Sequence, residues 1–142
     1  MKNLLFLLIF IVLISNSCSR GWQNISEGTD AEGGKFILAL DRSDIHGLEG
    51  TKTAWVRKTF EKPKTLKNGK TYQETYVYIA VNCRESKYSI IQIGMSNPGS
   101  SEFVHTVQFS EGSENLMWKD VPSDNISKKL YQELCTWYSA YF

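Results

Sequence analysis

The chain has 142 residues, the size of one domain, and its 16 Lys and Arg residues nearly balance its 15 Asp and Glu residues. This balance argues against a nucleic-acid-binding protein, because such domains usually carry a basic excess. With two His and three Cys residues, none in a CxxC or HxxxH spacing, the chain offers little material for a metal site, and we expect no metal and no cofactor.

The N-terminal residues 1–17 have the layout of a secretory signal peptide. Lys2 is their only charged residue, and the apolar run Leu4 to Ile14 is about half as long as the ~20 residues that span a bilayer as a helix. Small residues then precede Cys18, as in the cleavage box of bacterial lipoproteins, and Ser19 is compatible with outer-membrane sorting. We therefore predict removal of residues 1–17 and anchorage in the outer membrane through acyl chains on Cys18, palmitate among them.

The cysteine count bears on this prediction. If Cys18 is acylated, Cys83 and Cys135 remain as the only possible pair, in a compartment where structural disulfides persist. Ordinary signal cleavage after Ser17 also fits the sequence, because the small-x-small rule is satisfied there. That alternative leaves one cysteine without a partner.

Residues 18–34 are predicted to form an N-terminal tether, because Gly, Ser, Asn, Asp and Glu dominate them. The folded domain is then expected over residues 35–142. The apolar run Lys35 to Leu40 ends in a turn cluster and is predicted to be a buried strand. The alternating segment Lys52 to Phe60 is the next predicted strand.

The dipeptide Asn68-Gly69 is the strongest hairpin signal in the chain and predicts a type I′ turn, because both residues tolerate a positive φ. The long strand Thr71 to Arg84 follows, and its more apolar face leads to Cys83. Tyr88 to Met95 and Glu102 to Phe109 are two further predicted strands. Short turns separate all five candidates, which indicates an antiparallel meander.

The periodicity becomes helical only at the C-terminal end. Pro122-Ser123 is a helix-start signal with Ser123 as the N-cap, and the helical pattern runs on through Phe142 with Cys135 at the edge of the apolar face. We predict an α+β fold: an antiparallel β-sheet of five to six strands with a C-terminal α-helix packed on one face, tethered by a Cys83–Cys135 disulfide.

The mature chain resembles the surface-adhesin protein E-like domain of bacterial lipoproteins. The matching features are two apolar residues after the leader, a Cys at the end of a central strand, and a closing Trp, Pro-Ser, Leu and Cys: Trp22, Ile25, Cys83, Trp118, Pro122, Ser123, Leu130 and Cys135. The resemblance implies an antiparallel sheet with a disulfide-tethered C-terminal helix, displayed on the bacterial surface for adhesion to host matrix or plasma proteins.

The search for catalytic residues favours a protein that is not an enzyme. His46 lies in a predicted turn and His105 on a predicted strand, and neither has an evident nucleophile with an orienting third group. We therefore predict no catalytic residue. A periplasm-facing lipoprotein with a scaffolding or envelope-assembly role is the alternative function.

Two groups of residues are the candidate binding sites. Four lysines surround the predicted hairpin turn, and three tyrosines form a stripe on the less apolar face of the long strand: Lys62, Lys64, Lys67, Lys70, Tyr72, Tyr76 and Tyr78. The lysines alternatively keep a solvated loop soluble, and the tyrosines alternatively lie under the terminal helix as core. The expected partner is a host protein and not a nucleic acid, with a homodimer as a possible assembly.

Overall fold

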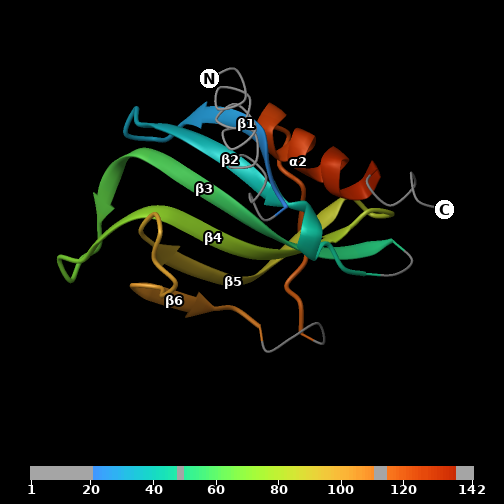
Figure 1. The fold of residues 1–142 in the computed structure, drawn as a ribbon. Helices are drawn as coiled ribbons and strands as arrows, with labels where there is room; N and C mark the ends of the chain where they lie inside the picture. Colours follow the sequence, from blue (N-terminus) through green and yellow to red (C-terminus); the bar gives the residue numbers. More distant parts are fainter. Residues whose placement is uncertain (1–20, 48–49, 111–114, 137–142) are drawn as a thin grey trace, which may run out of the picture.

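The strands pair in the order in which they follow one another in the sequence. The computed structural model describes residues 21–47, 50–110 and 115–136. Within these ranges lie seven strands, a short 3-10 helix and one α-helix (Figure 1): β1 (Trp22–Thr29), β2 (Lys35–Asp41), η1 (Arg42–Asp44), β3 (Thr51–Thr65), β4 (Thr71–Asn82), β5 (Lys87–Ser96), β6 (His105–Gln108), β7 (Lys119–Asp120) and α2 (Asn125–Thr136). The sheet order is β1-β2-β3-β4-β5-β6, β7 adds to β5, and every pairing is antiparallel.

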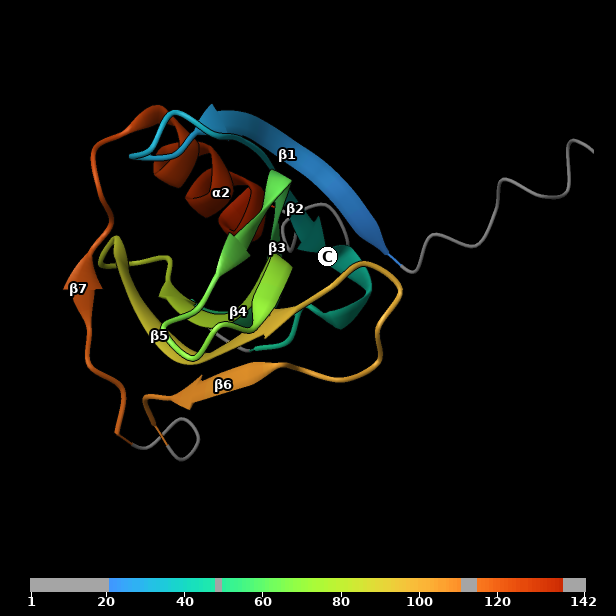
Figure 2. The ribbon, with the colours of Figure 1, turned by 90° about the vertical axis from the view of Figure 1, so that its left-hand side faces the viewer.

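The sheet curls around the helix. Figure 2 shows α2 on the concave face, with β1 passing on one side of it and β5 with β7 on the other. A strongly twisted antiparallel sheet can bury one face in this way while the other remains open to solvent. The predicted α+β class, with one C-terminal helix on one face of the sheet, is confirmed.

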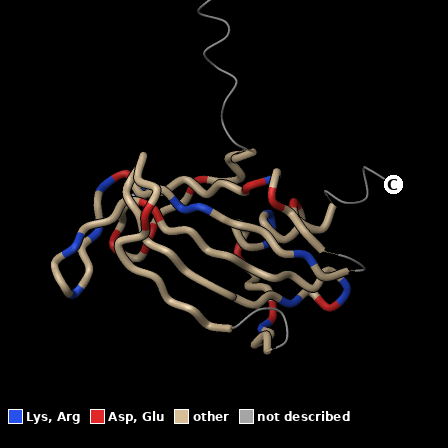
Figure 3. The backbone as a smooth tube through the Cα atoms, turned by 60° about the horizontal axis from the view of Figure 1, so that its bottom comes forward, with Lys and Arg blue, Asp and Glu red and all other residues tan. Residues whose placement is uncertain are grey.

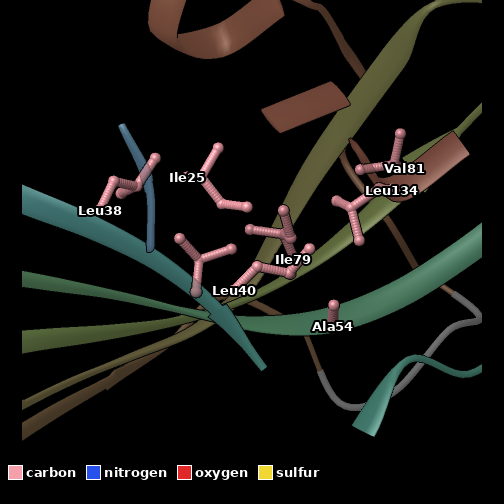
Figure 4. Packing of buried hydrophobic residues seen from close by; sticks show 8 residues of the cluster. Ile25, Leu38, Leu40, Ala54, Ile79, Val81 and Leu134 are labelled. Atoms are coloured by element: carbon pink, nitrogen blue, oxygen red, sulfur yellow. The ribbon is translucent and has the colours of Figure 1, made fainter. Parts of the chain in front are cut away.

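The hydrophobic core fills the space between α2 and the concave face. Its fully or nearly fully buried members come from the four strands β1 to β4 and the helix, and seven of them are labelled in Figure 4: Ile25, Leu38, Leu40, Ala54, Val56, Ile79, Val81 and Leu134. Leu40 and Leu134 have no exposed surface. Burial of an aliphatic side chain stabilises a fold by about 1.5–3 kcal/mol. The packing of this cluster therefore makes the main contribution to holding α2 on the sheet.

The predicted disulfide is confirmed and fixes the end of the helix. Cys83 directly follows β4 and is bonded to Cys135 in the last turn of α2, with a Cα–Cα distance of 5.7 Å. The Tyr131 hydroxyl donates a hydrogen bond of 2.8 Å to the Cys83 carbonyl, and the Arg42 guanidinium forms an ion pair with Glu133. Three contacts of different chemistry therefore hold the C-terminal half of α2 in place.

The tether expected over residues 18–34 is wrong from Trp22 onward. Residues Trp22–Thr29 form β1, which pairs with β2 from Trp22 opposite Asp41 to Thr29 opposite Lys35. A bulge between Asn24 and Ser26 breaks the alternation and directs Ile25 into the core, where 5% of its surface is exposed. Backbone pairing and one buried side chain therefore order a segment whose composition is that of a loop.

The hairpin between β3 and β4 forms at the predicted place with a different turn. The Gly69 N–H donates to the Leu66 carbonyl, the Leu66 N–H donates to the Lys70 carbonyl, and Gly69 has a φ of 82°. Asn68 is not among the described residues with a positive φ, so a type I′ turn is excluded. Instead, the Asn68 side chain accepts a hydrogen bond from the Lys70 N–H, and Gly69 alone takes the left-handed conformation of a three-residue hairpin loop.

The N-cap of α2 is Asp124, one residue after the predicted Ser123. The Asp124 carboxylate accepts a hydrogen bond of 2.9 Å from the Ser127 N–H, three residues ahead. Hydrogen bonds from the Ser127 side chain and backbone hold the pKa of Asp124 below its usual range. The predicted continuation of the helix to Phe142 lies outside the described residues.

Candidate binding surface

The face of the sheet that points away from α2, here called the outer face, carries a row of aromatic side chains with one arginine. Side chains alternate along β4, so the residues between the core positions Val77, Ile79 and Val81 point outward. The row consists of residues from β1, β3, β4 and the loop before β6: Trp22, Trp55, Arg57, Tyr76, Tyr78 and Phe103.

Four of these side chains contact one another across the sheet. The Arg57 Cζ atom lies 4.7 Å from the centroid of the Trp22 ring. The Tyr76 ring is edge-on to Trp22 on one side and to Phe103 on the other, with ring centroids 5.8 Å apart in both pairs. Such edge-to-face and cation–π geometries are attractive because the ring faces are electron-rich and the ring edges are not.

A second pair extends the row along the strands. Trp55 and Tyr78 are direct cross-strand partners of β3 and β4, and their rings stack with centroids 4.9 Å apart. The Tyr78 hydroxyl donates a hydrogen bond of 3.0 Å to the Thr53 hydroxyl. The pair is therefore fixed in orientation at both its apolar and its polar end.

Glycine at position 94 allows Phe103 to lie directly on the sheet. A Cβ atom at Gly94 would stand 2.5 Å from the Phe103 ring, which is too close for any real contact. Phe103 remains 43% exposed although it is packed in this way. The loop before β6 thus presents a large, ordered apolar side chain to solvent.

Polar groups accompany the aromatic row. The Tyr76 hydroxyl donates a hydrogen bond of 2.9 Å to Glu74, which is itself buried. Burial raises the pKa of Tyr76, and the Glu74 carboxylate raises it further. The Nε of Arg57 is buried and has no hydrogen-bond partner among the described residues.

The structure places the three predicted tyrosines at different sites. Tyr76 and Tyr78 are on the outer face, and the alternative in which they lie under the helix is therefore wrong for both. Tyr72 is at the start of β4, where its ring is edge-on to Phe60 with centroids 6.1 Å apart. It belongs to the hairpin end of the sheet and not to the row.

The four predicted lysines also separate into two kinds. Lys62, Lys67 and Lys70 are exposed around the tip of the β3–β4 hairpin, where basic residues gather in Figure 3. The Lys64 ammonium instead lies 2.6 Å from Asp30 and 2.7 Å from Glu32, and these hydrogen bonds raise the pKa of Lys64 well above its usual range. Lys64 therefore connects β3 to the β1–β2 turn, whereas the other three remain available to a partner.

The histidines show no catalytic arrangement in the described part of the chain. His46 Nε2 lies 2.6 Å from the Asp44 carboxylate in an exposed position, and His105 is exposed on β6. Among the described residues, no group of three His, Cys, Asp or Glu side chains could hold a metal ion.

Sequence reasoning missed four members of the row: Trp22, Trp55, Arg57 and Phe103. The alternation in the sequence places Trp55 and Arg57 on one face of the predicted strand. Only the register of β3 with β4 shows that Trp55 lies beside Tyr78 and Arg57 beside Tyr76. Trp22 was assigned to a tether. Phe103 was assigned to a strand, whereas it lies in the loop before β6.

The described fold defines a small α+β domain: a curled antiparallel sheet, one helix on its concave face and a disulfide between them. The chain belongs to the surface-adhesin protein E family, whose model matches residues 22–136. The match begins at the first residue of β1, and family membership indicates an adhesin-like protein of the cell surface.

Comparison with curated proteins and with solved structures finds no significant match. Within the described ranges, no helix has the length and apolar character needed to cross a membrane.

Proposed function

We propose that this protein is a bacterial surface lipoprotein that binds host extracellular matrix or plasma proteins and catalyses no reaction. Family membership supports the adhesin role. The single observation that carries the proposal is the outer face, where Trp22, Arg57, Tyr76 and Phe103 form a continuous ordered row.

The residue types of the row are those that dominate protein–protein binding energy. Trp, Tyr and Arg are enriched at interface hot spots, and each combines a large contact surface with a polar group. The contacts between them hold each ring in place before a partner arrives, which lowers the entropy lost on binding. Half-buried Arg57 adds a positive charge to the row, which favours an acidic group on the partner.

The hairpin tip supplies the electrostatic part of the proposed interaction. Lys62, Lys67 and Lys70 are exposed there, and three cations on one tip attract an acidic patch of a partner from a distance. Their contribution is to the association rate and falls with ionic strength. Lys64 is not part of this set, because Asp30 and Glu32 already neutralise it.

The proposal includes acylation of Cys18 and anchorage to the outer membrane, with the domain facing outward. Only three residues, 19–21, separate Cys18 from β1, so the domain would be held close to the membrane. Assembly into a homodimer through the outer face is compatible with the same anchor.

The experiment is a binding assay of the soluble domain against a panel of immobilised host matrix and plasma proteins. A variant with Lys62, Lys67 and Lys70 changed to Ser is compared with a variant in which Lys35, Lys128 and Lys129, exposed elsewhere, are changed to Ser. We expect at least one partner in the panel, with association slowed only in the hairpin variant. Absence of binding to every protein tested, together with no protease-accessible domain on intact cells, would contradict the proposal and favour the periplasm-facing alternative.

A further inference from the structure

An apolar cavity lies between the N-terminal half of α2 and the concave face of the sheet. It has a volume of about 290 Å³, close to the lower limit of the pockets that hold small molecules. Its walls come from β2 to β5, from the segment between β7 and α2, and from the helix: Phe36, Leu38, Val56, Val77, Ile79, Val81, Tyr88, Ile90, Val121, Pro122, Ile126 and Leu130, with Lys58, Ser127 and Tyr131. Three of these residues, Leu38, Ile79 and Val81, are labelled in Figure 4.

One charged group stands in this apolar lining. The Lys58 ammonium lies 3.9 Å from the centroid of the Phe36 ring and 5.1 Å from that of Phe60. Among the described residues, no carboxylate oxygen lies within the 4.0 Å of an ion pair with it. The nearby Asp30 carboxylate is bound to Lys64, and burial lowers the pKa of Lys58.

Two of the other polar groups of the lining already have partners. The Tyr131 hydroxyl donates to the Cys83 carbonyl, and the Ser127 N–H is used by the Asp124 cap. An extended peptide in the cavity would bring backbone N–H and C=O groups into apolar surroundings without acceptors and donors for them, which is costly. An alkyl chain brings none, and a single anionic head group matches the single ammonium.

We propose that this cavity binds one medium-chain monocarboxylate of up to about twelve carbons, with the alkyl chain between α2 and the sheet and the carboxylate on Lys58. The site is on the concave side of the sheet, separate from the outer face, so a ligand there does not compete with a protein partner of the aromatic row. Binding of the carboxylate in the cavity and adhesion through the outer face can therefore be tested in separate experiments.

The test is isothermal titration calorimetry of the purified Cys18→Ala protein, which lacks acyl chains that could compete. Octanoate, decanoate and dodecanoate are used below their micelle concentrations and are compared with uncharged dodecanol below its solubility limit. We expect one dodecanoate per chain, an affinity that falls roughly threefold to fourfold for each methylene removed, and weaker binding of dodecanol.

Three variants separate the contributions. Lys58→Met keeps the length of the side chain and removes the charge, so dodecanoate should lose its advantage over dodecanol while dodecanol binding persists. Ser127→Phe fills the cavity from the helix and should abolish binding of both. Lys128→Met, exposed on α2 and outside the lining, should change neither.

Failure of dodecanoate to bind the Cys18→Ala protein would overturn the proposal. Binding of dodecanoate that neither Lys58→Met nor Ser127→Phe weakens would also overturn it. The same holds if titration with an apolar peptide shows binding in the cavity and titration with the alkyl carboxylates shows none. Circular dichroism and retention of the Cys83–Cys135 disulfide confirm that each variant is folded before titration.

Discussion

The Arg57 guanidinium lies over the ring of Trp22, with 4.7 Å between Cζ and the ring centroid, and so joins the first strand of the sheet to the third across β2. Both residues also adjoin Tyr76: the Trp22 ring by an edge contact, and Arg57 as its direct partner in the β3–β4 ladder. The start of the folded domain and the middle of the outer face are therefore one structural unit.

This contact predicts an energetic coupling between β1 and β3. In a double-mutant cycle with Arg57→Met and Trp22→Leu, we expect a coupling of roughly 0.5–1 kcal/mol in the free energy of unfolding, since the site is half-buried. Urea denaturation of the four proteins measures it. Additive effects of the two changes would show that the observed stacking contributes nothing to stability.

The disulfide is predicted to be a large part of the stability of the domain. Cys83 and Cys135 are 52 residues apart, and closing a loop of this length contributes about 4 kcal/mol in the chain-entropy model. Replacement of both by Ser should lower the free energy of unfolding by approximately that amount. The matched control is dithiothreitol, which should destabilise the native protein and leave the double variant unchanged; an equal response of both would contradict the prediction.

The Asp124 cap is predicted to make the stability of α2 depend on pH. The pKa of Asp124 is lowered in the folded state, so the cap stabilises the fold above the unfolded value of about 3.9 and is lost as the pH falls through the lower folded value. Asp124→Ala should lower the melting temperature by a few degrees at neutral pH and have progressively less effect in acid.

Ser123 provides the control for this cap. Ser123→Ala should leave the melting temperature nearly unchanged at every pH, because the Ser127 N–H is bound by Asp124. If Ser123→Ala lowers the melting temperature more than Asp124→Ala does, then Ser123 caps the helix and the assignment to Asp124 is wrong.

Cys18→Ala is predicted to release the protein from the membrane. The proposed acyl chains are its anchor, so the variant should move from the membrane fraction to the soluble fraction after cell lysis. Immunoblots of the two fractions provide the measurement, and mass spectrometry of the native protein should find acyl groups on Cys18. Continued membrane retention of the variant would contradict lipid anchorage.

The sequence predicted those parts of the fold that regular alternation or helical periodicity encode. The strands that contain Leu38, Val56, Ile79 and Ile91 and the helix that contains Leu134 were assigned because their apolar residues repeat with the period of the element. The disulfide followed from the inward position of Cys83 and the place of Cys135 on the helix.

The remainder depended on tertiary contacts. β1 was missed because the bulge at Ile25 interrupts its alternation and its other residues are mostly polar. The outer face was found only in part, since Trp55 and Arg57 become neighbours of Tyr78 and Tyr76 through strand register, which a single sequence does not specify. Lys64 was grouped with the hairpin lysines because Asp30 and Glu32 are distant from it in the chain.

The most direct test of the proposed adhesion through the outer face compares two exposed phenylalanines. Phe103 is 43% exposed and contacts Tyr76 in the row, whereas Phe109 is 52% exposed and follows β6. The dissociation constant for a host protein from the binding panel is measured by surface plasmon resonance for Phe103→Ser and for Phe109→Ser. The account predicts that Phe103→Ser weakens binding by about tenfold or more, with Phe109→Ser near the native value. Equal affinities of the two variants and the native protein would contradict a binding role for the outer face.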